Sequence, residues 1–236
     1  MIEHRPFDTL GSIERGWLKA SLHFRFGELG RPGHTPMGAL HVWNDDEFAP
    51  HAGFDMHSHR NVEIVTYVRT GAITHADSFG NAARIEAGCV QAMSAGTGVL
   101  HSERNEEREP TRLFQIWLTP RSPNGEPRWA MRRCGLDEQQ GRLVVLASGD
   151  PADHRAGALA INANARLLGA TMLAGQTLVH ALPQDSQAYL VTTVGRLDVA
   201  NFRLAARDGI AVAGEPSFAM TAVDDTSIVM VTTRAA

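Results

Sequence analysis

Short apolar segments that are rich in β-branched residues and end at turn-forming residues recur along the whole chain. Residues 63–68 read EIVTYV and run into a Thr-Gly pair, and residues 112–118 read RLFQIWL and stop just before Pro120. Helical periodicity is weak, and only residues 136–141 suggest a short helix. Short strands separated by Gly, Pro, Asn and Asp are typical of sandwiches and closed barrels. The pattern therefore predicts an all-β protein.

The series of strand-like segments is interrupted at residues 120–127 and continues after them. The two halves on either side resemble each other. Residues 65–71 (VTYVRTG) resemble residues 189–195 (YLVTTVG), and both segments end at a glycine. Similarity at a fixed offset indicates a duplicated unit. We expect two tandem domains, residues 1–134 and residues 135–236.

Two pairs of polar residues in the first half have a spacing that suits a metal site. His57 and His59 form the first pair, and His101 and Glu103 form the second. Alternate side chains leave the same face of a strand, so four metal-binding groups would converge if both segments are strands. Three imidazoles and one carboxylate would leave one or two open positions on a divalent ion. The second half offers only His180 at the matching place, so we predict one metal ion per chain.

Most of the remaining histidines, of the eleven in the chain, are expected to have no part in that site. The ordinary surface residues are expected to be His4, His34, His51 and His154. The histidines that lie in strand patterns, and are expected to be structural or to line a pocket, are His41, His75 and His180. His23 has no assignment.

Both polar pairs lie within longer motifs. Residues 57–63 read HSHRNVE, an HxHxxxE pattern that a glycine follows at position 71, and residues 101–105 read HSERN after a glycine-rich turn. These segments resemble the two motifs of cupins, which are double-sheet jelly rolls. Two details depart from the common cupin pattern, because seven residues separate Glu63 from Gly71, and Gly96 stands where proline is usual.

Together with these departures, several short segments closely resemble the pirin family of bicupins. The segments are Gly53-Phe54, residues 77–81 (DSFGN), residues 93–98 (MSAGTG) and residues 115–117 (QIW). The resemblance is strong over residues 17–134 and faint over residues 135–236. It implies an all-β bicupin fold with two tandem cupin (jelly-roll) β-barrel domains, of which the first binds metal.

The resemblance also implies a ligand set. In pirins the metal is held by both histidines of the first motif and by the His and Glu of the second, which are here His57, His59, His101 and Glu103. Glu63, a ligand in many other cupins, is not expected to bind the metal here. It would instead contact one of the ligands on the side away from the metal and fix its orientation. The donor types suit iron, nickel, copper, manganese or zinc. The resemblance favours iron(II).

Pirin-like bacterial proteins commonly act as quercetin 2,3-dioxygenases, which open the central ring of a flavonol with dioxygen and release carbon monoxide. This chain would then bind a flavonol and dioxygen, with Glu103 as the candidate general base. A flat substrate would enter through the mouth of the site, which would be lined by Phe54, Met56 and Phe48. The alternative is a non-catalytic, iron- or redox-sensing pirin that regulates a partner protein or transcription. A third alternative is a substrate other than a flavonol.

Composition and charge bear on the partners of the protein and on its compartment. The net charge is 22 − 26 = −4 and the pI is about 6.2, which argues against direct nucleic-acid binding, so the isolated protein is expected not to shift duplex DNA at physiological salt. Cys89 and Cys134 form no CxxC pair, which favours a reducing compartment. The N-terminus lacks an apolar signal-peptide core, and no apolar run is long enough to span a bilayer. We expect a cytoplasmic monomer that makes no membrane contact.

Overall fold

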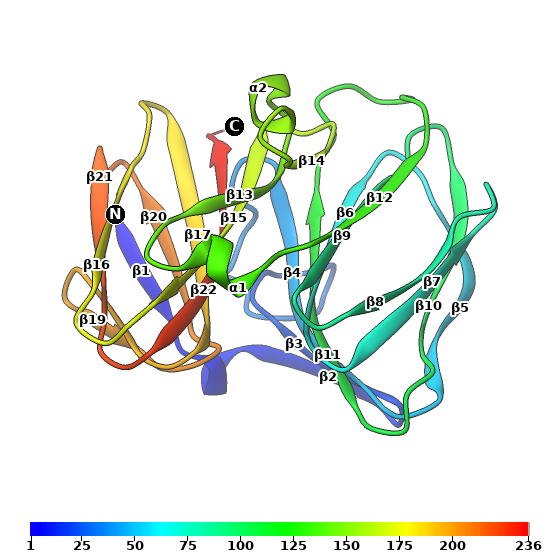
Figure 1. Ribbon diagram of the computed structural model, residues 1–236, viewed down its shortest axis with the longest axis horizontal. Coiled ribbons are helices and arrows are strands. Elements are labelled where there is room, and N and C mark those ends of the chain that lie inside the picture. The colour runs from blue at the N-terminus through cyan, green and yellow to red at the C-terminus, as the bar shows by residue number, and fades with distance from the viewer. Residues whose placement is uncertain (236) are drawn as a thin grey trace.

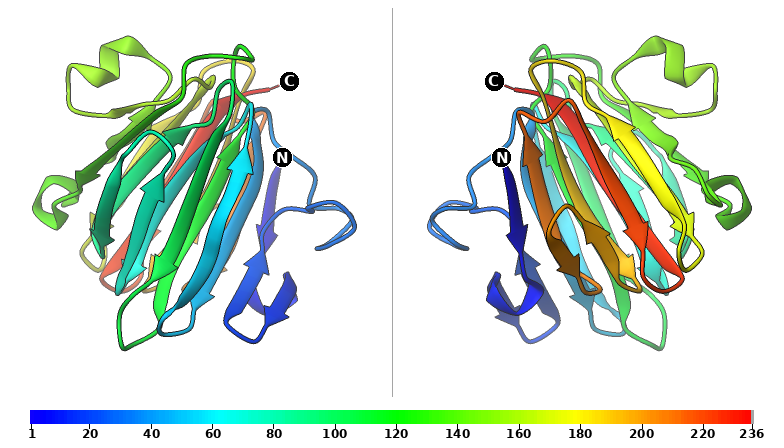
Figure 2. Two further views of the ribbon diagram at one scale, coloured as in Figure 1. Left: turned by 90° about the vertical axis from the view of Figure 1, so that its right-hand side faces the viewer. Right: turned by 90° about the vertical axis from the view of Figure 1, so that its left-hand side faces the viewer.

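The computed structural model describes residues 1–235 and consists mostly of β-strands in two tandem halves (Figure 1). Each half pairs a seven-stranded sheet with a four-stranded sheet. The short helices among the described residues are η1 (Phe7–Thr9), α1 (Leu136–Gln139) and α2 (Pro151–His154). The strands run side by side, and α1 and α2 lie outside them (Figure 2). The predicted all-β fold of two jelly rolls is confirmed.

The sheets of the first half carry the predicted metal segments. The large sheet has the order β12 (Arg128–Arg133), β9 (Cys89–Ser94), β6 (Glu63–Thr70), β11 (Thr111–Leu118), β4 (Leu40–Phe48), β3 (Leu18–Leu22) and β2 (Gly11–Arg15). The small sheet has the order β5 (Ala52–His59), β10 (Val99–Asn105), β7 (Ala72–Asp77) and β8 (Ala82–Glu86).

The second half repeats most of this plan. Its large sheet has the order β1 (Ile2–Arg5), β20 (Gly209–Ala213), β17 (Ser186–Val194), β22 (Thr226–Arg234), β15 (Ala165–Met172), β13 (Val144–Ser148) and β14 (Leu159–Ala160). Its small sheet has the order β16 (Thr177–Ala181), β21 (Ser217–Ala222), β18 (Leu197–Val199) and β19 (Phe202–Leu204). The equivalent order of the inner strands and of the small sheets supports the duplication that the sequence pattern indicated. The edges differ, because β14 runs parallel to β13 whereas β2 runs antiparallel to β3.

The chain's first strand, β1, belongs to the second half. It pairs antiparallel with β20, in the place that β12 occupies beside β9 in the first half. Residues 2–5, which we expected within the first domain, therefore complete the large sheet of the second. The chain therefore starts in the second half, passes through the first half, and then returns to the second.

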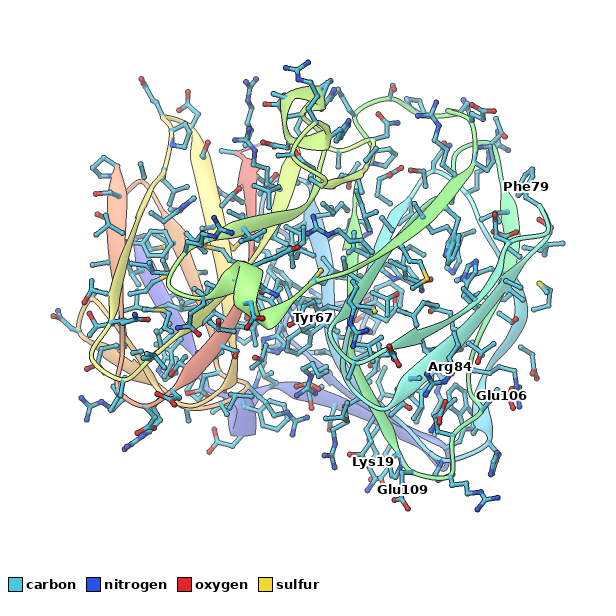
Figure 3. All side chains as sticks on the ribbon, in the orientation of Figure 1. Lys19, Tyr67, Phe79, Arg84, Glu106 and Glu109 are labelled. Atoms are coloured by element: carbon cyan, nitrogen blue, oxygen red, sulfur yellow. The ribbon has the colours of Figure 1, made fainter. Side chains whose placement is uncertain are left out.

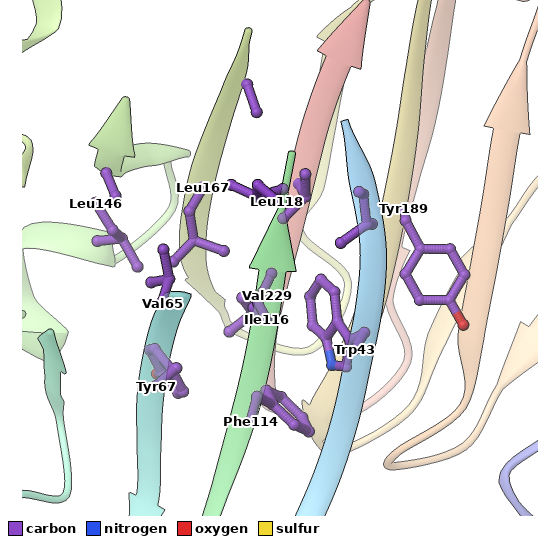
Figure 4. Close-up of a cluster of buried hydrophobic side chains, with 14 of the residues drawn as sticks. Trp43, Val65, Tyr67, Phe114, Ile116, Leu118, Leu146, Leu167, Tyr189 and Val229 are labelled. Atoms are coloured by element: carbon purple, nitrogen blue, oxygen red, sulfur yellow. The ribbon is translucent and has the colours of Figure 1, made fainter. Parts of the chain in front are cut away.

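The halves pack back to back through their large sheets. A single apolar cluster joins Trp43, Phe114 and Val65 of the first half to Tyr189 and other residues of the second (Figure 4). Strands such as β6 are therefore buried on both faces, which explains their continuous apolar runs. This packing leaves the two small sheets on the outside of the molecule (Figure 1). Among the described residues, no helix is long and apolar enough to cross a membrane.

Candidate metal centre

The two predicted segments form the adjacent antiparallel strands β5 and β10. His101 lies directly opposite His57, whereas Glu103 lies opposite Phe54, so β5 contains one more residue than β10 over this stretch. Such a β-bulge turns side chains out of the regular alternation. Within it, Nδ1 of His57 lies 2.7 Å from the carbonyl oxygen of Asp55. Because this nitrogen donates its proton to the carbonyl, Nε2 is left with a lone pair for a metal.

Three histidines converge at this point. The ring centroids lie 4.5 Å apart for His57 and His101, 4.8 Å for His57 and His59, and 5.1 Å for His59 and His101. One ring nitrogen of each lies within 4.8 Å of the others. His101 is 1% exposed, and neither of its ring nitrogens has a hydrogen-bond partner in the described structure. Three imidazole nitrogens that converge in this way fit a divalent transition metal.

The electrostatics of the cluster favour metal binding. Burial, with a further contribution from neighbouring histidines, lowers the pKa of His101 to about 3 and that of His59 to about 4. Both rings are therefore neutral at pH 7. A histidine binds a metal only in its neutral form, so no proton has to be displaced from these two rings.

Glu103 is buried and its carboxylate accepts three hydrogen bonds. Thr66 Oγ1 donates to Oε1 over 3.1 Å, Gln91 Nε2 donates to the same oxygen, and Gln115 Nε2 donates to Oε2. The donors come from β6, β9 and β11 of the large sheet. Burial raises the pKa of Glu103 to about 7, although the three donors act in the opposite direction.

Two tryptophans fix the orientation of the glutamines that face Glu103. Trp129 Nε1 donates to Gln91 Oε1 over 2.8 Å, and Trp117 Nε1 donates to Gln115 Oε1 over 3.4 Å. Because each amide oxygen is occupied by an indole N–H, each amide NH₂ is directed at the carboxylate. The side chains around Glu103 thus present hydrogen-bond donors to its carboxylate oxygens.

The four predicted ligands are not equally close. His57, His59 and His101 form one group of donors within 4.8 Å, while Glu103 belongs to a second group with His101 and His75. From its strand pattern, we expected His75 to be structural or to line a pocket. Its spacing two residues before an acidic residue on a strand, in His75-Ala-Asp77, was the signal that could have drawn attention to it.

Glu63 does not have the expected role of orienting a ligand. Its carboxylate accepts a hydrogen bond of 2.6 Å from Ser94 Oγ and one of 2.8 Å from the backbone N–H of Asn162. Asn162 lies in the second half, so Glu63 joins the two halves. In the part of the chain that the structure describes, the hydrogen bonds of Glu63 go to these groups and not to a histidine.

Replacing Glu63 with Ala is expected to lower the free energy of unfolding by about 1–3 kcal/mol, since Ser94 and the Asn162 N–H would be left buried without an acceptor. Metal content should not change. Chemical denaturation and elemental analysis of the same preparations would check both expectations. A loss of metal without a loss of stability would restore the original assignment of Glu63.

The three residues expected at the mouth lie in different environments. Phe48 is fully buried and packs edge-to-face against Phe54 at 5.5 Å, so it lies in the core behind the mouth and does not line it. Phe54 is half-buried, 5.6 Å from the ring of His57. Met56 is exposed on β5.

A hollow of about 570 Å³ opens beside His59, and Arg60, Ser78 and Leu100 also line it. Leu100 is exposed, as is the neighbouring Phe79, which lies at the outer end of the first half (Figure 3). Leu100 and Phe79 were not expected at this place, because β10 and the turn at residues 78–81 meet only in the folded chain.

Among the described residues, the matching place in the second half holds a single histidine. His180 lies directly opposite Phe218 of the neighbouring strand β21, and the two rings are 5.8 Å apart. Over residues 1–235, the groups close enough to hold a metal ion all lie in the first half. A group of donors that could hold a metal ion is thus present in one copy of the duplicated fold.

Two jelly rolls packed through their large sheets, with a histidine cluster in the first alone, define a bicupin with one candidate metal centre. Each half matches a known family. The family model described as Pirin matches residues 4–118, and the one described as Quercetinase C-terminal cupin domain matches residues 145–232. The chain belongs to the pirin family.

Individual relatives agree over the whole length. A pirin-like protein of Caulobacter vibrioides is 48% identical over 98% of this chain and 99% of its own. The quercetin 2,3-dioxygenase of Escherichia coli K12 is 32% identical over 98% of this chain and 97% of its own. The crystal structure of bacterial pirin YhhW from Escherichia coli in complex with nickel(II) is 30% identical and covers 100% of both chains, with a TM-score of 0.93.

Proposed function

We propose that this protein is a metal-dependent dioxygenase that opens flavonols, a quercetin 2,3-dioxygenase of the pirin type. The observation that carries the proposal is the trihistidine cluster beside a buried carboxylate, next to a hollow that reaches His59. The relative named as a quercetin 2,3-dioxygenase supports the same activity.

The site would take one divalent ion through His57, His59 and His101, with Glu103 beside it. Iron(II) is our first choice, and nickel, copper, manganese and zinc suit the same donors. The YhhW structure supports a divalent ion, because it holds nickel. When bound, the ion would act as a Lewis acid that stabilises the ionised 3-hydroxyl of the flavonol.

Glu103 would accept the proton of that hydroxyl. Burial raises the pKa of Glu103 and so makes its carboxylate a better proton acceptor, whereas a bound cation acts in the opposite direction. The amides of Gln91 and Gln115 hold its carboxylate in place, so little reorganisation is needed when the proton moves. Phe54, Met56 and Leu100 offer apolar surface for the flat rings of the substrate.

Oxygen uptake tests the proposal. Metal-free protein is loaded with each of the five candidate ions in turn, and dioxygen consumption and carbon monoxide release are measured with quercetin. At least one ion should give catalytic turnover with equal amounts of both gases. If no ion supports turnover at full occupancy, the assignment as a flavonol dioxygenase is wrong.

A second candidate function is regulation of a partner protein through the redox state of bound iron. The observation that favours it is a group of exposed apolar side chains near the mouth: Met56 is 53%, Phe79 60% and Leu100 47% exposed. Exposed apolar groups of this kind are typical of interaction sites. This function would require metal binding without flavonol turnover, so the same oxygen measurement separates the two candidates.

A further inference from the structure

His75 lies directly behind the candidate centre, and the proposed function does not use it. It is on β7, is 0% exposed, and lies opposite Glu103 in the antiparallel pairing of β7 with β10. Its ring stacks on Trp129 at 5.0 Å with an interplanar angle of 14°, and its centroid is 5.5 Å from that of His101. The ring is therefore held in one orientation.

The two ring nitrogens of His75 have different surroundings. Nε2 lies 3.3 Å from Asp77 Oδ2, whereas Nδ1 is buried and has no partner in the described structure. Asp77 is fixed in turn by Asn81, whose side-chain amide donates to Oδ2 over 2.8 Å. A carboxylate that holds the far nitrogen of a histidine is the usual arrangement behind a metal ligand.

Burial of an unpartnered nitrogen is unfavourable unless something binds to it. Both nitrogens of His101 are unpartnered as well. His75, His101 and Glu103 each offer a donor atom, and these three atoms lie within 4.8 Å of one another. Unlike the outer group of His57, His59 and His101, the inner group has every member fully buried.

We propose that the centre has a second, inner metal position formed by His75, His101 and Glu103, which a single divalent transition-metal ion occupies in place of the outer trihistidine position. The two positions share His101, so the ion would move by exchanging ligands around one histidine. This inference rests on the metal centre of the proposed function but not on its flavonol chemistry.

The two positions would differ in access. The outer one lies beside the hollow at His59, where a substrate can reach it. The inner one is enclosed, since its three donors are at most 3% exposed. An ion held there would be protected from exchange and closed to substrate.

Cobalt(II) binding to variants of the full chain tests the inner position. Wild-type protein should bind one ion per chain. The H57A/H59A variant removes two donors of the outer group and should still bind one cobalt(II), with an affinity lower by about 10²-fold or more. Adding H75Q should abolish that residual binding. Adding H180Q instead, at a half-buried histidine of β16 in the second half, should leave it unchanged.

Equilibrium dialysis and visible absorption give the readout, with circular dichroism to verify folding. Absence of cobalt(II) from folded H57A/H59A would overturn the inner position, as would residual binding that H75Q does not affect. If H57A/H59A does not fold, H75Q alone decides: it should weaken binding and alter the cobalt(II) spectrum, and an unchanged affinity and spectrum would overturn the proposal. A wild-type protein that binds no metal would instead refute the metal centre itself.

Discussion

Replacing Glu103 with Gln is expected to lower flavonol turnover by about 10²-fold or more while the protein retains substantial metal, because that is the usual scale of losing a general base. His57, His59 and His101 would still offer three donors. The surroundings make the substitution more disruptive than its shape suggests. Each facing glutamine has its oxygen held by a tryptophan, so the new amide NH₂ would meet another NH₂ at one of its two ends.

Metal content and quercetin turnover should be measured on the same preparations of Glu103→Gln. Glu109→Gln is the matched control, since Glu109 is an exposed residue in the connection between β10 and β11 (Figure 3) and belongs to neither group of donors. Raising the pH should recover part of the loss, because the substrate then arrives already ionised. Turnover equal to that of the parent at full metal occupancy would rule out the general-base role.

The outer part of the site could be predicted because it depends on local spacing. His57 and His59 are two residues apart on one strand, as are His101 and Glu103, and alternation alone places each pair on a common face. The environment of Glu103 could not be predicted in this way. Thr66 and Gln115 contact it from separate strands, and the register between strands distant in sequence is set by the packed core, not by local pattern.

The fold, like the site, could be predicted where it depends on local sequence and not where it depends on contacts between distant segments. Strand rhythm and the internal repeat predicted two jelly rolls, because apolar alternation and turn residues are local signals. They did not predict that β1 joins the second half, since its four residues, Ile2–Arg5, carry no marker of their partner β20. Nor did they place Glu63, whose partner Asn162 lies 99 residues away along the chain. Both errors concern contacts between the halves.

Replacing His101 with Ala is expected to bring the metal content close to zero, whereas a loss of either His57 or His75 would leave one group of three donors complete. His101 is the only residue that the two groups have in common among the described residues. Its removal therefore leaves two donors in each, too few to compete with water for a divalent ion.

Elemental analysis of freshly purified His101→Ala, and of the same protein after loading with iron(II) or nickel(II), would measure the effect. The matched control is His154→Ala, at a histidine of α2 whose ring nitrogen bonds to the backbone oxygen of Ser148 over 2.8 Å in the second half. That variant should keep one ion per chain. A His101→Ala protein that still binds one ion would show that the ligands are wrongly assigned, because every arrangement of donors at this centre passes through His101. Loss of metal from His154→Ala would instead indicate that the ion depends on the second half, although both groups of donors lie in the first half.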